Sequence, residues 1–213
     1  MDKKEFLDEQ IIEMLNEVEG QDDALENNTP QAEIKPEDRT IYTGLKIKGK
    51  WTYFEERMFI DDKITMMVPD HFNKMSEADA KIKYPSEDRP KVILTDQTTS
   101  VNIMFSQMEG TFTNEDVEGT RDQIFGMMRR VNPGLNEQEK GIETILDQTF
   151  AHVSFTNPTL DGKLYNLLYF FVVEDMLIMG AFNCMTRDIK YWKKAVFEMM
   201  KSIRIIDEEE KAT

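Results

Sequence analysis

The chain of 213 residues has one cysteine, two histidines and seven prolines, and it contains no long uncharged hydrophobic run. A single cysteine cannot form an intramolecular disulfide, which excludes a small disulfide-stapled scaffold and is typical of a reducing compartment. No window reaches the roughly 18 uncharged apolar residues that a membrane-spanning helix requires. The first residues are charged where a secretory signal would be apolar. We therefore expect a cytoplasmic protein without a membrane span.

Negative charge is concentrated at the N-terminal end of the chain. Residues 1–40 contain 13 acidic and 4 basic side chains, and the whole chain has a net charge of −15. Nucleic-acid binding needs a concentrated basic face, so we expect no nucleic-acid partner. Basic residues form two short groups, which we interpret as solvated surface: Lys46, Lys48 and Lys50, and Lys190, Lys193 and Lys194.

The first 43 residues differ in pattern from the rest of the chain. Leu7, Ile11 and Leu15 recur at helical spacing, which predicts an amphipathic helix within residues 1–20. Residues 21–43 are polar and show no sustained periodicity, which predicts a linker. We expect residues 44–206 to form one folded domain and residues 207–213 to form an acidic tail.

Strand patterns joined by short polar turns dominate this domain. Two hairpins are predicted first and four strands follow, at residues 51–60 with 63–68, 91–95 with 101–107, 142–146, 150–155, 164–173 and 176–182. Helices are predicted from Ser76 to Tyr84, from Asn114 to Pro133, and after a cap at Asp188. The last helix should bury Trp192 and its neighbours and thereby stabilise the domain. The order predicts an α+β fold, an antiparallel sheet with helices packed on its faces.

No group of residues predicts a catalytic, cofactor or metal site. Residues 44–50 spell most of a phosphate-binding loop, but Trp51 stands where magnesium coordination needs Ser or Thr, and a strand is predicted to follow. His71 and His152 lack the spacing of paired metal ligands. Cys184 has apolar neighbours and no nearby base, so we interpret it as an inert, packed thiol. We therefore expect neither an enzyme nor a bound cofactor.

Fifteen methionines are the one unusual feature of the composition. Methionine fills irregular cores, and this is the favoured interpretation for most of them. Its flexible and polarizable side chain also suits a surface that accepts varied apolar partners. Five methionines from different predicted elements are the candidates for such a partner-binding face: Met66, Met104, Met108, Met128 and Met199.

Three segments of the domain are informative in combination: the strand at 64–68 with Pro69-Asp70-His71-Phe72, the long strand ending at 177–182, and the closing helix with Trp192 and Met200-Lys201-Ser202-Ile203. With the order of the elements, they resemble the PsbP-like fold, which is shared by the photosystem subunit PsbP, the Ran-binding Mog family, the bacterial DcrB proteins and the Eag chaperones of type VI secretion effectors. The resemblance implies an antiparallel sheet with helices on both faces and a non-enzymatic binding role. It identifies no functional residue.

Two functions remain in consideration. The first is a non-catalytic, chaperone-like adaptor that engages an apolar segment of a partner protein. The alternative is a small-molecule binder or hydrolase with an unrecognised carboxylate cleft, which a deep pocket with a raised-pKa Asp or Glu would favour. The sequence identifies neither the partner nor the oligomeric state, and a homodimer stays open.

Overall fold

A computed structural model describes residues 34–35, 38–87, 89–90, 92–160 and 162–206. The chain divides into two compact units, Met1–Asp38 and Arg39–Thr213. The predicted N-terminal helix, most of the predicted linker and the acidic tail lie outside the described residues. Every helix and strand among the described residues belongs to the second unit.

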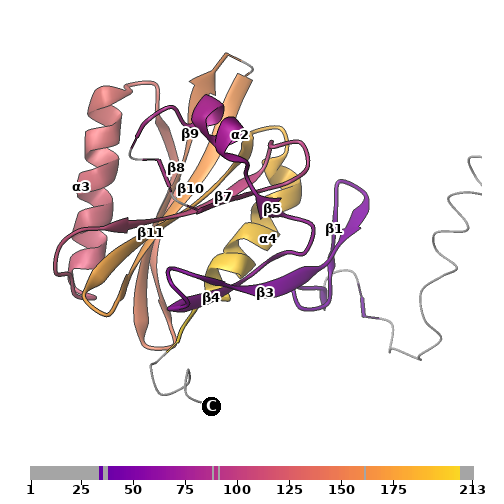
Figure 1. Cartoon of the computed structure of the whole chain (residues 1–213), viewed down its shortest axis with the longest axis horizontal. Coiled ribbons are helices and arrows are strands. Elements are labelled where there is room, and N and C mark those ends of the chain that lie inside the picture. The colour runs from indigo at the N-terminus through magenta and orange to yellow at the C-terminus, as the bar shows by residue number, and fades with distance from the viewer. Residues whose placement is uncertain (1–33, 36–37, 88, 91, 161, 207–213) are drawn as a thin grey trace, which may run out of the picture. The chain divides into compact units, whose positions relative to one another are not determined.

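A seven-stranded antiparallel sheet forms the centre of this unit (Figure 1). Its strand order is β5-β6-β7-β11-β10-β9-β8. The strands are β5 (Asn73–Lys74), β6 (Val92–Thr95), β7 (Asn102–Met108), β8 (Asn136–Ile145), β9 (Gln148–Thr159), β10 (Gly162–Val173) and β11 (Met176–Met185). One edge strand, β5, is therefore very short, and the other, β8, is long and exposed along most of its length.

Two smaller sheets accompany the large one. The strands β1 (Leu45–Ile47) and β2 (Lys50–Thr52) form a hairpin, whose turn has positive φ at Lys48 and Gly49. A three-stranded sheet has the order β12-β4-β3, with β3 (Phe54–Phe59), β4 (Ile64–Pro69) and β12 (Arg204–Ile205). The predicted strand 51–60 is thus two strands, because Trp51 pairs with Lys46 in the hairpin and β3 begins only after Tyr53.

Among the described residues, three helices cover the large sheet: α2 (Glu77–Lys83), α3 (Asp116–Val131) and α4 (Ile189–Lys201). The Ser76 side chain accepts a hydrogen bond from the Asp79 amide and begins α2 as predicted. Asp188 precedes α4 but makes no side-chain capping bond, which corrects the prediction, because its carboxylate lies 2.8 Å from Lys48 Nζ. None of the described helices is both long and apolar enough to cross a bilayer.

The sheet separates two hydrophobic cores. Successive side chains of a strand point to opposite faces, so a strand that is buried on both sides reads as a continuous apolar run, as β10 does. The α4 core lies between the sheet, α4 and the three-stranded sheet, and it includes Phe72, Phe105, Tyr169, Phe171, Phe182 and Trp192. The α3 core lies under α2 and α3, and it includes Val117, Phe125, Ala151, Phe155, Phe170 and Val172.

Other boundaries also differ from the predictions, and two of them change the arrangement of the domain. Ile41 is 1% exposed and belongs to the α4 core, although its polar surroundings placed it in the linker. The strand predicted at 142–146 begins at Asn136, because main-chain pairing with β9 extends through a polar segment that has no apolar pattern.

Candidate functional site: an apolar groove beside α3

The α3 side of the sheet is left partly uncovered, and a groove of about 520 Å³ lies there. We call it the α3 groove; it is lined by Tyr84, Met127, Met128, Val131, Asn132, Leu135, Phe155, Asn157, Leu164, Asn166 and Asn183. No carboxylate, lysine, arginine or histidine is among these described lining residues. The groove is therefore a neutral and largely apolar surface.

The last turns of α3 form the apolar wall of the groove. Val131 is 88% exposed and Met127 is 48% exposed, whereas Leu135 and Phe155 beneath them are buried. The helix ends at Val131 because the Asn132 amide closes the last turn on Met128 and Pro133 follows. Single exposed apolar side chains are common, but here they continue into a concave apolar surface, which is typical of a binding site.

Three asparagines, Asn157, Asn166 and Asn183, lie at the floor of the groove, and Asn102 is buried beside Asn183. Asn102, Asn183 and Asn166 are direct cross-strand neighbours on β7, β11 and β10. Asn102 Nδ2 donates to Asn183 Oδ1 over 2.8 Å, and Asn183 Nδ2 donates to the Tyr84 hydroxyl over 3.2 Å. Asn166 Nδ2 donates to Asn157 Oδ1 over 2.7 Å. The floor therefore offers hydrogen-bond donors and acceptors without net charge.

Burial affects two polar groups at or beside this floor, the Tyr84 hydroxyl and the Asn102 side chain. It raises the pKa of Tyr84, and the hydrogen bond from Asn183 partly opposes that shift, so this phenol is a neutral hydrogen-bonding group at physiological pH. The Oδ1 atom of Asn102 is buried and has no hydrogen-bond partner within the described part of the chain. Such an unsatisfied acceptor costs free energy, but Asn102 is fully buried and does not line the groove.

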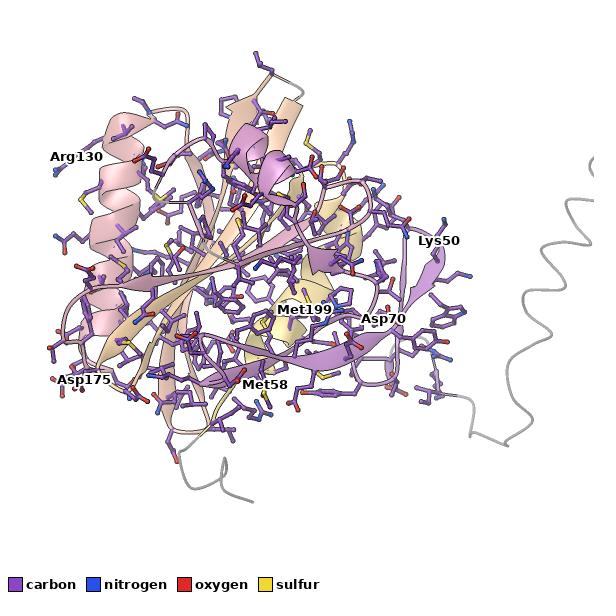
Figure 2. All side chains as sticks on the ribbon, in the orientation of Figure 1. Lys50, Met58, Asp70, Arg130, Asp175 and Met199 are labelled. Carbon is purple, nitrogen blue, oxygen red and sulfur yellow. The ribbon has the colours of Figure 1, made fainter. Side chains whose placement is uncertain are left out.

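The structure does not bring the five candidate methionines together. Met66 and Met199 are buried in the α4 core, Met104 is buried in the α3 core, and Met108 packs against that core. Figure 2 labels Met199 near the centre of the view. Met128 is the candidate that lines the α3 groove. Sequence reasoning missed the asparagine row, although polar residues at core-facing positions of apolar strands were a usable signal.

Neither the two histidines nor the cysteine lines the groove. His71 is exposed after β4, with Nδ1 3.2 Å from Asp70 Oδ1, whereas His152 is buried in β9 against the ring of Phe197. No cluster of three or more His, Cys, Asp or Glu side chains able to hold a metal ion occurs among the described residues. Burial, with a smaller contribution from Asp188, raises the pKa of Cys184 to about 12, so its thiol is protonated and unreactive.

His152 gives the fold a predicted dependence on pH. Burial lowers the pKa of His152 most; Glu143 and Glu139 raise it, and Arg121 and Lys201 lower it further. A histidine in the unfolded chain has a pKa of about 6.5. As the pH falls below this value, the unfolded chain therefore binds a proton that the folded chain excludes. Stability from the neutral imidazole is therefore present above about pH 6.5 and is lost below it.

We expect the native protein to lose more unfolding free energy than a His152→Gln variant between about pH 7.5 and pH 5. Urea denaturation of both proteins at the two pH values measures this loss of free energy. The carboxylates that both proteins share contribute to both losses, so the difference between the losses reports on His152. An equal loss in both proteins would show that His152 does not contribute.

Comparison with known proteins places the fold. No family model and no curated protein matches the sequence. The solution structure of cyanobacterial PsbP (CyanoP) from Synechocystis sp. PCC 6803 matches with a TM-score of 0.55 and 12% identity, over 72% of this chain and 92% of that chain. The crystal structure of LpqN, involved in cell envelope biogenesis of Mycobacterium tuberculosis, is 12% identical over 79% of this chain and 98% of that chain, with a TM-score of 0.48. The folded unit therefore has the PsbP-like α+β fold that its element order predicted.

Proposed function

We propose that this protein is a non-catalytic binding domain that engages an apolar segment of a partner protein in the α3 groove. The observation that carries the proposal is the exposure of Val131 and Met127 at the rim of a concave, uncharged surface. Covering such side chains is favourable by about 25 cal/mol for each Å² removed from water. A non-catalytic role agrees with the absence of ionisable acid or base side chains from the described groove lining, apart from the neutral Tyr84 phenol.

The asparagines at the floor of the groove require hydrogen-bonding groups on the partner segment. Asn157 and Asn166 are partly exposed, and a purely apolar ligand would bury their amides without new hydrogen bonds. A polypeptide meets both requirements, because apolar side chains can face Met127 and Val131 while a main-chain or amide group meets the asparagines. This combination favours a peptide segment over a hydrocarbon chain.

A neutral small molecule is the second candidate. The volume of the α3 groove, about 520 Å³, lies within the roughly 300–1,000 Å³ that is typical of small-molecule sites. The hydrolase form of this candidate lacks support, because no Asp or Glu is among the described residues that line the α3 groove, and the described carboxyl groups with a resolved pKa shift, Asp116 and Asp122, have a lowered pKa. A general acid needs a pKa shifted in the opposite direction.

The test replaces Val131 by glutamate in the full chain. We expect a fluorescein-labelled helical peptide of about 16 residues, composed of leucine, alanine and glutamine, to bind the native protein. Val131→Glu should weaken binding at least about tenfold, because a charge then faces the apolar ligand. Fluorescence anisotropy measures the affinity. Since Val131 is 88% exposed, the unfolding free energy should change by less than about 0.5 kcal/mol.

Ile82→Glu is the matched control, because Ile82 is 82% exposed on α2 and does not line the groove. It should bind the peptide as the native protein does. Equal weakening in both variants, or no binding by the native protein, would contradict the proposal. A small molecule retained in native mass spectrometry by the native protein and lost from Val131→Glu would favour the second candidate.

A further inference from the structure

Two groups of basic residues that are far apart in the sequence lie side by side in the structure. Lys48 Nζ, in the turn of the β1–β2 hairpin, lies 2.8 Å from Asp188 Oδ1 at the start of α4. Lys194 Nζ of α4 donates to the Arg39 carbonyl oxygen over 2.5 Å. The Ile41 amide donates to Glu198 over 2.9 Å. These contacts join the hairpin and the first turns of α4 into one surface.

Three lysines of this surface are exposed and make no ion pair among the described residues. Residues 39–213 contain 23 Lys or Arg and 28 Asp or Glu side chains. Lys46, Lys50 and Lys190 are exposed, and within the described part of the chain no carboxylate lies at ion-pair distance from any of them. The other three lysines of the two groups are paired with carboxylates: Lys48 with Asp188, Lys193 with Glu139 and Lys194 with Glu198. Positive charge is therefore locally in excess here.

Exposed aromatic rings lie among these cations. Trp51 and Tyr191 are each 42% exposed. The Arg39 guanidinium lies 4.4 Å from the centre of the Trp51 ring, and Lys190 Nζ lies 4.7 Å from the centre of the Tyr191 ring. Trp51 is the direct cross-strand neighbour of Lys46. Ring contacts of this kind hold cations in fixed positions, and exposed aromatic and arginine side chains are the residues that most often dominate binding energies.

We propose that this surface, the basic–aromatic face of Arg39, Lys46, Lys50, Trp51, Lys190 and Tyr191, binds a short acidic segment of a partner protein in which apolar residues are interspersed. The lysines supply charge complementarity and the rings cover the apolar side chains. The face is a second site, on different elements from the α3 groove. The basic–aromatic face could not be predicted from either of the two short lysine groups, because only the fold brings the two groups together.

The size of the face selects a short ligand. The face includes only the first turn of α4, with Lys190 and Tyr191, and the short β1–β2 hairpin, so it fits a segment of about six extended residues. A nucleic-acid duplex or an anionic bilayer would extend beyond the face onto a surface where acidic side chains outnumber basic ones, and like charges would oppose it. A short acidic peptide avoids that repulsion.

The test measures binding of a fluorescein-labelled peptide of about six alternating glutamates and leucines to the full chain. Reversing one charge on each element, with Lys46→Glu and Lys190→Glu together, should weaken binding at least about tenfold. Binding should also weaken as salt is raised from about 50 to 300 mM, because these charges are exposed. Added peptide should protect the exposed Trp51 from acrylamide quenching, since the other tryptophan, Trp192, is already buried.

The matched control reverses the same number of charges on α3, with Arg129→Glu and Arg130→Glu. Both arginines are exposed, and Figure 2 shows Arg130 and Lys50 on opposite sides of the view. We expect less than about twofold weakening in this control, and none in Val131→Glu, which separates this face from the proposed function.

Four results would overturn the proposal. The first is no binding of the peptide, and the second is equal weakening in the control pair, which would indicate unspecific attraction. The third is tighter binding to a single-stranded oligothymidine or to vesicles containing phosphatidylserine than to the peptide. The fourth is loss of peptide binding in Val131→Glu, which would show one site instead of two.

Discussion

Replacing Trp192 by alanine is expected to lower the free energy of unfolding by about 3–5 kcal/mol. Trp192 is 4% exposed, and its ring centre lies 5.7 Å from that of Phe72 and 6.0 Å from that of Phe182. It therefore fixes α4 to the segment after β4 and to β11 at once. Its removal leaves a cavity that the surrounding rings cannot fill, because they belong to different elements.

Urea denaturation followed by circular dichroism measures this loss. Tyr191→Ala is the matched control, because the neighbouring residue of the same helix is 42% exposed and should cost less than about 1 kcal/mol. Since a domain of this kind is stable by only about 5–15 kcal/mol, Trp192→Ala can be largely unfolded. Trp192→Phe keeps part of the ring and should fall between the two. A loss equal to that of Tyr191→Ala would mean that α4 is not held through this residue.

Replacing Gly180 by alanine should destabilise the fold by about 3 kcal/mol or more, although it adds a single methyl group. Gly180 lies directly opposite Tyr169 on the neighbouring strand. A Cβ at Gly180 would lie 1.9 Å from Cε2 and 2.2 Å from Cζ of Tyr169. The tyrosine ring is 2% exposed and packs between Phe105 and Phe171, so it cannot move aside. The strand must therefore distort.

Gly119→Ala is the control, because it should raise the free energy of unfolding instead of lowering it. Its added Cβ would meet no atom within 4 Å, and it lies within α3, where alanine is favoured over glycine by about 0.5–1 kcal/mol. Denaturation curves should thus move in opposite directions for the two substitutions. The double variant Gly180→Ala with Tyr169→Leu should recover part of the loss, since the smaller side chain leaves room. No recovery would show that the clash with Tyr169 is not the cause.

Most of the fold could be predicted from the sequence, because turn residues and hydrophobic periodicity agree with the packing in the structure. The hairpin β6–β7, the cap of α2 at Ser76 and the burial of Trp192 on α4 were all predicted from turn residues and periodicity. The short strand β12 was missed, because two residues after a helix carry no pattern of their own and pair only through β4. The fit of Tyr169 over Gly180 was missed for the same reason, since register between strands is not a local property.

The candidate sites were harder to predict than the fold. Methionine content indicates adaptable apolar surface but not its location, and the structure places Met66 and Met199 in one core and Met104 in the other. The groove depends on where α3 ends relative to the sheet, and its floor depends on strand register. The basic–aromatic face likewise depends on a contact between Lys48 and Asp188, which are separated by most of the chain.

Both edge strands of the large sheet have features that oppose pairing with a strand of another copy of the protein. An edge strand with free main-chain groups is a template for aggregation, and natural proteins protect such edges with brevity, charge or a bulge. Here β5 contributes two residues, while β8 carries Glu137, Glu139, Lys140 and Glu143 and has a register shift between Glu137 and Glu139. Both edges are thus poor templates for adding a further strand. We therefore expect the polar segment of β8, which carries no hydrophobic pattern, to oppose cross-β assembly and amyloid growth at this edge.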